Sequence, residues 1–137
     1  MTSGAERRLL QIVIAVAALV PLAAGAAGVL RGPEMLAGVA APVAIDLDSH
    51  YRYLSGLLLG IGLVFVACIP AIERHGSVVR AAGAVVIAGG LARLFSLWQA
   101  GLPGPGHLFG LAMELGVVPA ILLWQARIAR RAVSRSA

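Results

Sequence analysis

Charged side chains are scarce in this sequence, where they make up 12% of 137 residues, and lysine is absent. A soluble domain carries about 25% charged residues. Hydrophobic residues make up 60% of the chain, and its mean hydropathy is +0.93. A soluble chain of this length could not bury so much apolar surface, because small domains leave a large share of their surface exposed. The composition therefore indicates that lipid surrounds much of the protein.

Cysteine and aromatic residues are also few. The single cysteine, Cys68, lies in an apolar run, so one chain has neither a disulfide framework nor a cysteine-based metal site. The formal net charge is +5, but the arginines flank apolar runs and do not form a basic patch with interleaved aromatic residues. A membrane surface with anionic lipids explains them better, so we expect membrane lipids and no nucleic acid as partners.

Four apolar stretches follow one another along the chain. We expect membrane spans at residues 9–30, 53–72, 78–100 and 107–126, each close to the roughly 20 residues that a helix needs to cross hydrocarbon. The first stretch resembles a secretory signal, because Arg7 and Arg8 precede it, but its apolar run is long for one, and an uncleaved helix is expected. Short loops after the second and third spans make neighbouring helices antiparallel. The sequence thus predicts an all-α, single-domain, integral membrane four-helix bundle with up-down topology.

The placement of arginine predicts how this bundle is oriented. Only Arg31, Arg52 and Arg93 fall toward one side of the predicted membrane. The others fall on the opposite side: Arg7, Arg8, Arg74, Arg80, Arg127, Arg130, Arg131 and Arg135. Because cytoplasmic loops carry an excess of basic residues, both termini are expected in the cytoplasm and the connection 31–52 outside.

Small residues recur at spacings that favour helix packing in lipid. Gly28 and Gly32 have GxxxG spacing, and so do Gly56 and Gly60, which Arg52 is expected to head. The third span is expected to carry one face made of Gly83, Val86, Gly89, Gly90 and Arg93, and the fourth a face made of His107, Gly110, Glu114 and Val118. Small and ionisable residues are therefore expected on the same faces.

Arg93 and Glu114 are the only charged residues well inside a predicted span. They lie at nearly equal distances from the loop centred on Gly104, so an antiparallel hairpin brings them to the same depth. A lone arginine at mid-span costs roughly 2.5–3.5 kcal/mol, and a structural ion pair between the two is expected. The pattern fits two interpretations equally well: an ion pair that fixes the register of the two helices, or an ion pair that forms part of a binding site.

Further polar residues are expected to join this pair in one outward-facing pocket. The predicted ligand-binding residues are His50, Arg52, Arg93, His107 and Glu114. Guanidinium groups bind carboxylate and phosphate oxygens bidentately. Asp48 precedes the second span and is expected to be solvated, so it would not neutralise Arg52. The positive charge that remains in the pocket predicts an anionic ligand. Two histidines with carboxylates also suit a divalent cation, but no HxxxH or HExxH spacing supports a metal site. A histidine–glutamate acid/base pair is the enzymatic alternative.

The sequence around these residues resembles a known family. Residues 50–56, 89–97, 101–103 and 113–115 are similar to a bacterial membrane family described as domain of unknown function 4345, which looks akin to the DoxX-like four-helix membrane proteins. The resemblance implies a four-helix bundle in which Arg52, Arg93 and Glu114 match recurrent polar positions. It implies no established reaction, and DoxX relatives often serve as accessory subunits of membrane redox systems.

The sequence therefore favours a small, multi-pass protein of the bacterial inner (plasma) membrane whose outward-facing polar pocket binds a lipid-like or small anionic ligand. One alternative is an accessory subunit of a larger, possibly redox, membrane complex, and a homo-oligomer is also compatible with the glycine faces. A second alternative is a membrane enzyme acting on a lipid or quinone, but a non-enzymatic role is favoured and no catalytic residue is assigned. The sequence names no cofactor.

Overall fold

The structure is a computed structural model, and it describes residues 3–133. The chain divides into two compact units, which we call the N-terminal hairpin (residues 13–67) and the C-terminal unit (residues 1–12 and 68–137). Every regular element in the described part is helical, and four helices are long and apolar enough to cross a membrane: Gly4–Arg31, Ile45–Ala71, Gly76–Ala100 and Pro105–Arg131. The all-α class and the prediction of four helices that could span a membrane are confirmed, whereas the bounds of the spans stay predictions. The orientation of the termini stays a prediction.

The first two long helices are α1 (Ser3–Arg31) and α2 (Ile45–Cys68), joined through a short 3-10 helix, η1 (Pro33–Met35). A second 3-10 helix, η2 (Ile69–Ala71), leads to α3 (Gly76–Ala100). The last stretch is one helical rod in three parts: α4 (Pro105–Ala112), the π-helical turn η3 (Met113–Val117) and α5 (Val118–Val133). The helices extend beyond the apolar runs at most ends, and α2 begins eight residues before the predicted second span.

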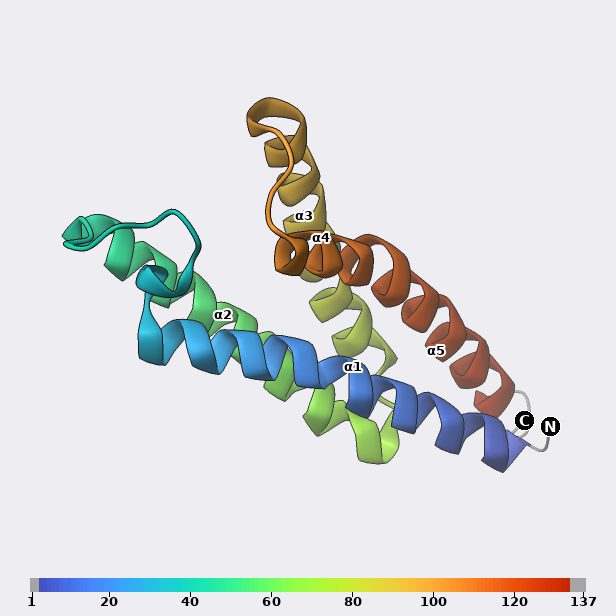
Figure 1. The fold of residues 1–137 in the computed structure, drawn as a ribbon. Helices are drawn as coiled ribbons and strands as arrows, with labels where there is room; N and C mark the ends of the chain where they lie inside the picture. The colour runs from blue at the N-terminus through green and yellow to red at the C-terminus, as the bar shows by residue number, and fades with distance from the viewer. Residues whose placement is uncertain (1–2, 134–137) are drawn as a thin grey trace. The chain divides into compact units, whose positions relative to one another are not determined.

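In the N-terminal hairpin, α1 and α2 run side by side in opposite directions (Figure 1). Glycines let the two backbones approach: a Cβ on Gly25 would lie 2.6 Å from the Leu59 nitrogen, and one on Gly28 would collide with Ser55. At Gly32, which follows the last residue of α1, the φ of +68° also favours glycine. Gly25 and Gly28 thus supply the closest contacts on the α1 side of this interface, as expected for helices that pack in lipid.

The α2 side of the hairpin differs from the expectation. A Cβ on Gly60 would have no atom within 4 Å, and the nearest atom to a Cβ on Gly56 would be a Val29 methyl carbon at 4.0 Å. The residues that face α1 are instead Ser55, Leu59 and Gly62. Gly56 and Gly60 therefore do not make the close contact with α1 in this hairpin, because α2 is rotated so that the residue three positions after Arg52 faces α1 more directly than the one four positions after.

In the C-terminal unit, α3 packs against the α4–η3–α5 rod, and Figure 1 shows the two crossing near α4. Three glycines of α3, spaced seven residues apart, line this contact: Gly76 lies against Gln125, Gly83 against Leu122, and Gly90 against Glu114 and Leu115. Gly89 has no atom within 4 Å of its would-be Cβ. The predicted face is thus right for Gly83 and Gly90 but wrong for Gly89.

The turn between α2 and α3 is held from two directions within this unit. From the start of α1, Arg7 donates hydrogen bonds to the Glu73 carboxylate (2.9 Å) and the Pro70 carbonyl oxygen (2.7 Å), and Gln11 donates to the Ile69 carbonyl oxygen (2.7 Å). From α5, the fully buried Gln125 donates to the Ile72 carbonyl oxygen at 2.8 Å. These bonds satisfy backbone carbonyls that the end of a helix leaves without partners.

Candidate functional site

Arg93 of α3 is the centre of a polar cluster in the C-terminal unit. Its Nε donates to Glu114 Oε2 at 3.0 Å, and its Nη2 donates to Glu114 Oε1 at 3.1 Å. This two-point contact is the strongest geometry available to a guanidinium and a carboxylate. The Glu114 side chain is 15% exposed and that of Arg93 33%. The pair therefore links α3 to the helical rod while leaving part of the guanidinium accessible.

The third nitrogen of the guanidinium engages a histidine. Nη1 of Arg93 lies 2.9 Å from Nδ1 of His107, which belongs to the first turn of α4. An arginine can only donate hydrogen bonds, so Nδ1 must accept and the neutral ring carries its proton on Nε2. The His107 side chain has no other hydrogen bond within residues 3–133. The cluster is electrically balanced, and the N–H of His107 Nε2 is a donor that has no acceptor in that part of the chain.

A π-helical turn carries Glu114. In η3 the Val118 N–H bonds to the Met113 carbonyl oxygen, five residues back, where an α-helix would bond four residues back. Pro119 follows directly, and it has no N–H to continue the α-helical pattern. The widened turn accommodates the proline and adds one residue to the rod. π-Helical turns are frequent at functional sites.

Glycines leave the room that the cluster occupies. A Cβ on Gly90 would lie 2.8 Å from the Glu114 Cβ, closer than real Cβ atoms approach each other. Gly110 lies beside the guanidinium, and its would-be Cβ is 3.7 Å from the Arg93 Cζ. The first contact requires glycine and the second merely suits it.

Arg52 belongs to a separate arrangement in the N-terminal hairpin. Its Nε and Nη2 donate to the two carboxylate oxygens of Asp48 at 2.8 and 3.0 Å, one helical turn back on α2. Its Nη1 donates to the carbonyl oxygens of Val29 (2.5 Å) and Leu30 (3.3 Å) at the end of α1. Asp48 was expected to precede the span and stay solvated, but α2 begins at Ile45 and places it on the face of Arg52. Arg52 therefore does not contribute the unbalanced charge that the sequence suggested.

The structure thus brings together three of the five predicted ligand-binding residues: Arg93, His107 and Glu114. Arg52 and His50 lie on α2 in the other unit, and His50 is exposed, with no side-chain hydrogen bond or ion pair in the described part of the chain. A single pocket that includes all five residues stays a prediction. Within residues 3–133 no three histidine, cysteine or acidic side chains are grouped so that they could hold a metal ion.

Sequence reasoning missed one feature of the Arg93 cluster and one feature of the N-terminal hairpin. It assigned no role to the π-helical turn, although Pro119, five residues after Glu114 in an apolar run, is a signal for an irregular turn. It also paired neither Arg52 with Asp48 nor Arg52 with the end of α1, although the spacing of four residues is typical of an ion pair on one helix.

The sequence profile of a family described as "Domain of unknown function (DUF4345)" matches residues 9–125, and the chain belongs to this family. The match covers all five predicted ligand-binding residues and confirms the family resemblance. The kinship with DoxX-like proteins and the bacterial origin stay predictions. No curated protein and no solved structure matches the chain.

Proposed function

We propose that this member of the DUF4345 family is a small membrane protein that binds a lipid-like molecule through Arg93, His107 and Glu114. The observation that supports the proposal most is the N–H of His107 Nε2, which has no acceptor in the described part of the chain. His107 is exposed, so this donor can reach a molecule outside the chain. A headgroup oxygen is the acceptor that a bilayer can supply.

The charge balance of the cluster refines the class of ligand. Glu114 neutralises Arg93, and the partially exposed guanidinium edge and His107 are then hydrogen-bond donors in a neutral site. An acceptor oxygen of a carbonyl, hydroxyl or phosphate group meets both donors, and net negative charge is not required. Leu108 and Phe109, which follow His107 in α4, are exposed and offer apolar surface to an attached chain. An amphipathic ligand suits this combination better than a small ion.

Native mass spectrometry of protein extracted in mild detergent tests the proposal. We expect retained non-protein mass on the wild type and its loss in His107→Phe, which keeps a ring but removes both ring nitrogens. His50→Phe is the matched control, because His50 is an exposed histidine of the other unit. It should retain the mass.

Three other outcomes are informative. Loss of the mass in both variants would support a single pocket that includes His50. Unchanged occupancy in His107→Phe would overturn the role of the cluster. A wild type that carries no small molecule but co-purifies with a larger protein would instead favour the accessory-subunit role.

We also propose that the protein resides in a bacterial inner membrane with both termini in the cytoplasm. The support is the excess of arginine near the chain ends and in the α2–α3 turn. A periplasmic phosphatase fused after Ala137 should be inactive, and a phosphatase inserted in the connection 36–44 should be active. The reverse pattern would overturn the orientation.

A further inference from the structure

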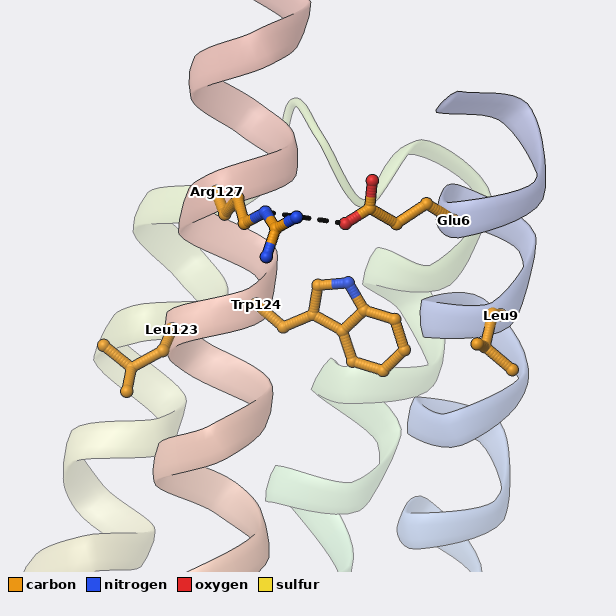
Figure 2. A pocket seen from close by; sticks show the side chains of 5 residues that line it. All are labelled: Glu6, Leu9, Leu123, Trp124 and Arg127. Carbon is orange, nitrogen blue, oxygen red and sulfur yellow. Dashed lines mark ion pairs between the residues drawn. The ribbon is translucent and has the colours of Figure 1, made fainter. Parts of the chain in front are cut away.

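A pocket lies at the arginine-rich end of the C-terminal unit, away from the Arg93 cluster. Its volume is about 440 Å³, and it is lined by Glu6 and Leu9 of α1 and by Leu123, Trp124 and Arg127 of α5. Figure 2 shows the Trp124 indole between the two helices, with Glu6 and Arg127 on one side of the ring. None of these residues takes part in the Arg93 cluster.

The lining changes in character along the two helices. Leu9 and Leu123 are large apolar side chains, and they are exposed by 41% and 75%. Trp124 follows, a residue that is enriched where hydrocarbon meets the headgroups. Arg127 lies about one helical turn further toward the end of the chain, and its side chain is 61% exposed. Apolar wall, indole and cation thus follow one another in the order in which a phospholipid presents its acyl chain, ester region and phosphate.

The ion pairs at the pocket leave Arg127 accessible. The Glu6 carboxylate approaches Arg131 closely, with 2.6 Å between Oε2 and Nη1, but its distance to Arg127 is 3.7 Å, too long for a hydrogen bond. Glu6 is thus committed mainly to Arg131. The dashed line in Figure 2 marks only the looser contact with Arg127.

The charges around the pocket have a strong positive excess. In the described part of the chain this end of the unit carries two glutamates, Glu6 and Glu73, against seven arginines: Arg7, Arg8, Arg74, Arg80, Arg127, Arg130 and Arg131. An excess of this kind attracts anionic lipid headgroups by about 1 kcal/mol for each basic residue near the surface. A ligand that complements the pocket is therefore both amphipathic and negatively charged.

We propose that this pocket binds an anionic phospholipid, with its phosphate at the Arg127 guanidinium and an acyl chain along Trp124, Leu9 and Leu123. The site is distinct from the Arg93 cluster, and the inference does not depend on the proposed function. Arg127 selects the anionic headgroup, whereas the other arginines only raise the local concentration of anionic lipid.

The two tryptophans of the chain make the proposal measurable. In a Trp98→Phe background Trp124 is the only indole, and its fluorescence reports contact with lipids whose chains carry bromine. The protein is reconstituted in phosphatidylcholine vesicles that contain a rising fraction of brominated phosphatidylglycerol or, in a parallel series, brominated phosphatidylcholine. We expect Trp124 to favour phosphatidylglycerol by more than about fivefold, since one arginine–headgroup contact alone supplies about fivefold and the other arginines add to it.

Two arginine variants distinguish binding of the lipid at Arg127 from a general attraction of anionic lipid to all the arginines. Arg127→Gln should lower the preference by about fivefold, to the level that the other arginines supply. Arg8→Gln removes the same charge from an exposed arginine that does not line the pocket, and it should keep most of the preference. Both side chains are largely exposed, so both variants should keep the melting temperature of the parent protein.

Several results would overturn the proposal. One is a parent protein that shows no preference for phosphatidylglycerol, and another is an equal loss in Arg8→Gln and Arg127→Gln. A third is the removal of the preference by inorganic phosphate, which would mean that the arginines recognise a free anion and not a lipid. In the reverse reporter, Trp124→Phe, the remaining Trp98 should show no preference, since it lies near the far end of α3.

Discussion

The two side-chain pairs Arg52–Asp48 and Arg93–Glu114 have the same hydrogen-bond geometry, but one lies within a single helix and the other joins two elements. Arg52 and Asp48 lie one turn apart on α2, so the ion pair forms within a single helix. Arg93 and Glu114 lie on α3 and on the π-helical turn, so the pair joins two elements. Both carboxylates accept two hydrogen bonds from their arginine.

The third nitrogen of each guanidinium shows what the difference means. In Arg52 it donates to backbone carbonyls of Val29 and Leu30, which lie in the last turn of α1, where the helix leaves carbonyls without intrahelical partners. In Arg93 it contacts the His107 ring, which retains a donor of its own. Arg52 thus completes a helix end, whereas Arg93 leaves a polar group available. We infer that the first arginine stabilises the hairpin and the second belongs to a site.

The largest effect is expected from breaking the inter-helix pair. Arg93→Leu and Glu114→Leu should each lower the free energy of unfolding by roughly 3 kcal/mol, because each leaves a charge unpaired among apolar helices. The double variant should cost less than either single change. Thermal melting in detergent measures this cycle, and strictly additive losses would contradict a direct interaction. The same cycle on Asp48 and Arg52 should give a coupling of at most about 1 kcal/mol, the range of exposed pairs on one helix.

A pair of adjacent glycines tests the packing behind the cluster. Gly90→Ala places a methyl group against Glu114 and Leu115, and the overpacking should cost about 1–3 kcal/mol. Gly89→Ala meets open space and should stabilise α3 by about 0.5–1 kcal/mol, because alanine is the better helix former. Detergent melting of the two variants compares them directly. Equal losses would show that the α3 face is not the one described.

Arg52→Gln should have a smaller effect on stability than any change at Arg93. The loss of the bonds to the end of α1 is expected to cost about 1 kcal/mol, the usual net contribution of such hydrogen bonds. Retained ligand, measured by native mass spectrometry, should be unchanged. The sequence alone predicts the opposite, that Arg52 holds an anion, so ligand loss in this variant would restore the single-pocket hypothesis.

The smallest change in stability is expected for His107→Phe. His107 is exposed, and the substitution keeps Glu114 on Arg93, so the free energy of unfolding should change by less than about 0.5 kcal/mol. Ligand retention should nevertheless fall. A large loss of stability, measured by the same melting assay, would mean that the histidine acts as a structural partner of Arg93.

The sequence predicted those features that depend on order and length along the chain. Four apolar runs predict four candidate spans, and the short loop at Gly104 sets Arg93 and Glu114 at one depth whatever the details of packing. The sequence did not predict which residues face a neighbouring helix, because the rotation of each helix about its axis decides that. Positions three and four residues after Arg52 lie almost equally close to its face, and only packing against α1 selects Ser55 over Gly56. The choice between Gly89 and Gly90 has the same origin.

The extra residue in the π-helical turn has a consequence for comparing related sequences. Glu114 and Leu122 are eight positions apart, which a regular α-helix would rotate by about 80° from each other, yet both face glycines of α3. The turn absorbs one residue and brings them into line. A relative that lacks one residue between these positions could keep both contacts in an uninterrupted helix. Alignments through residues 113–117 should therefore permit a one-residue gap, or they will assign the carboxylate to the wrong column.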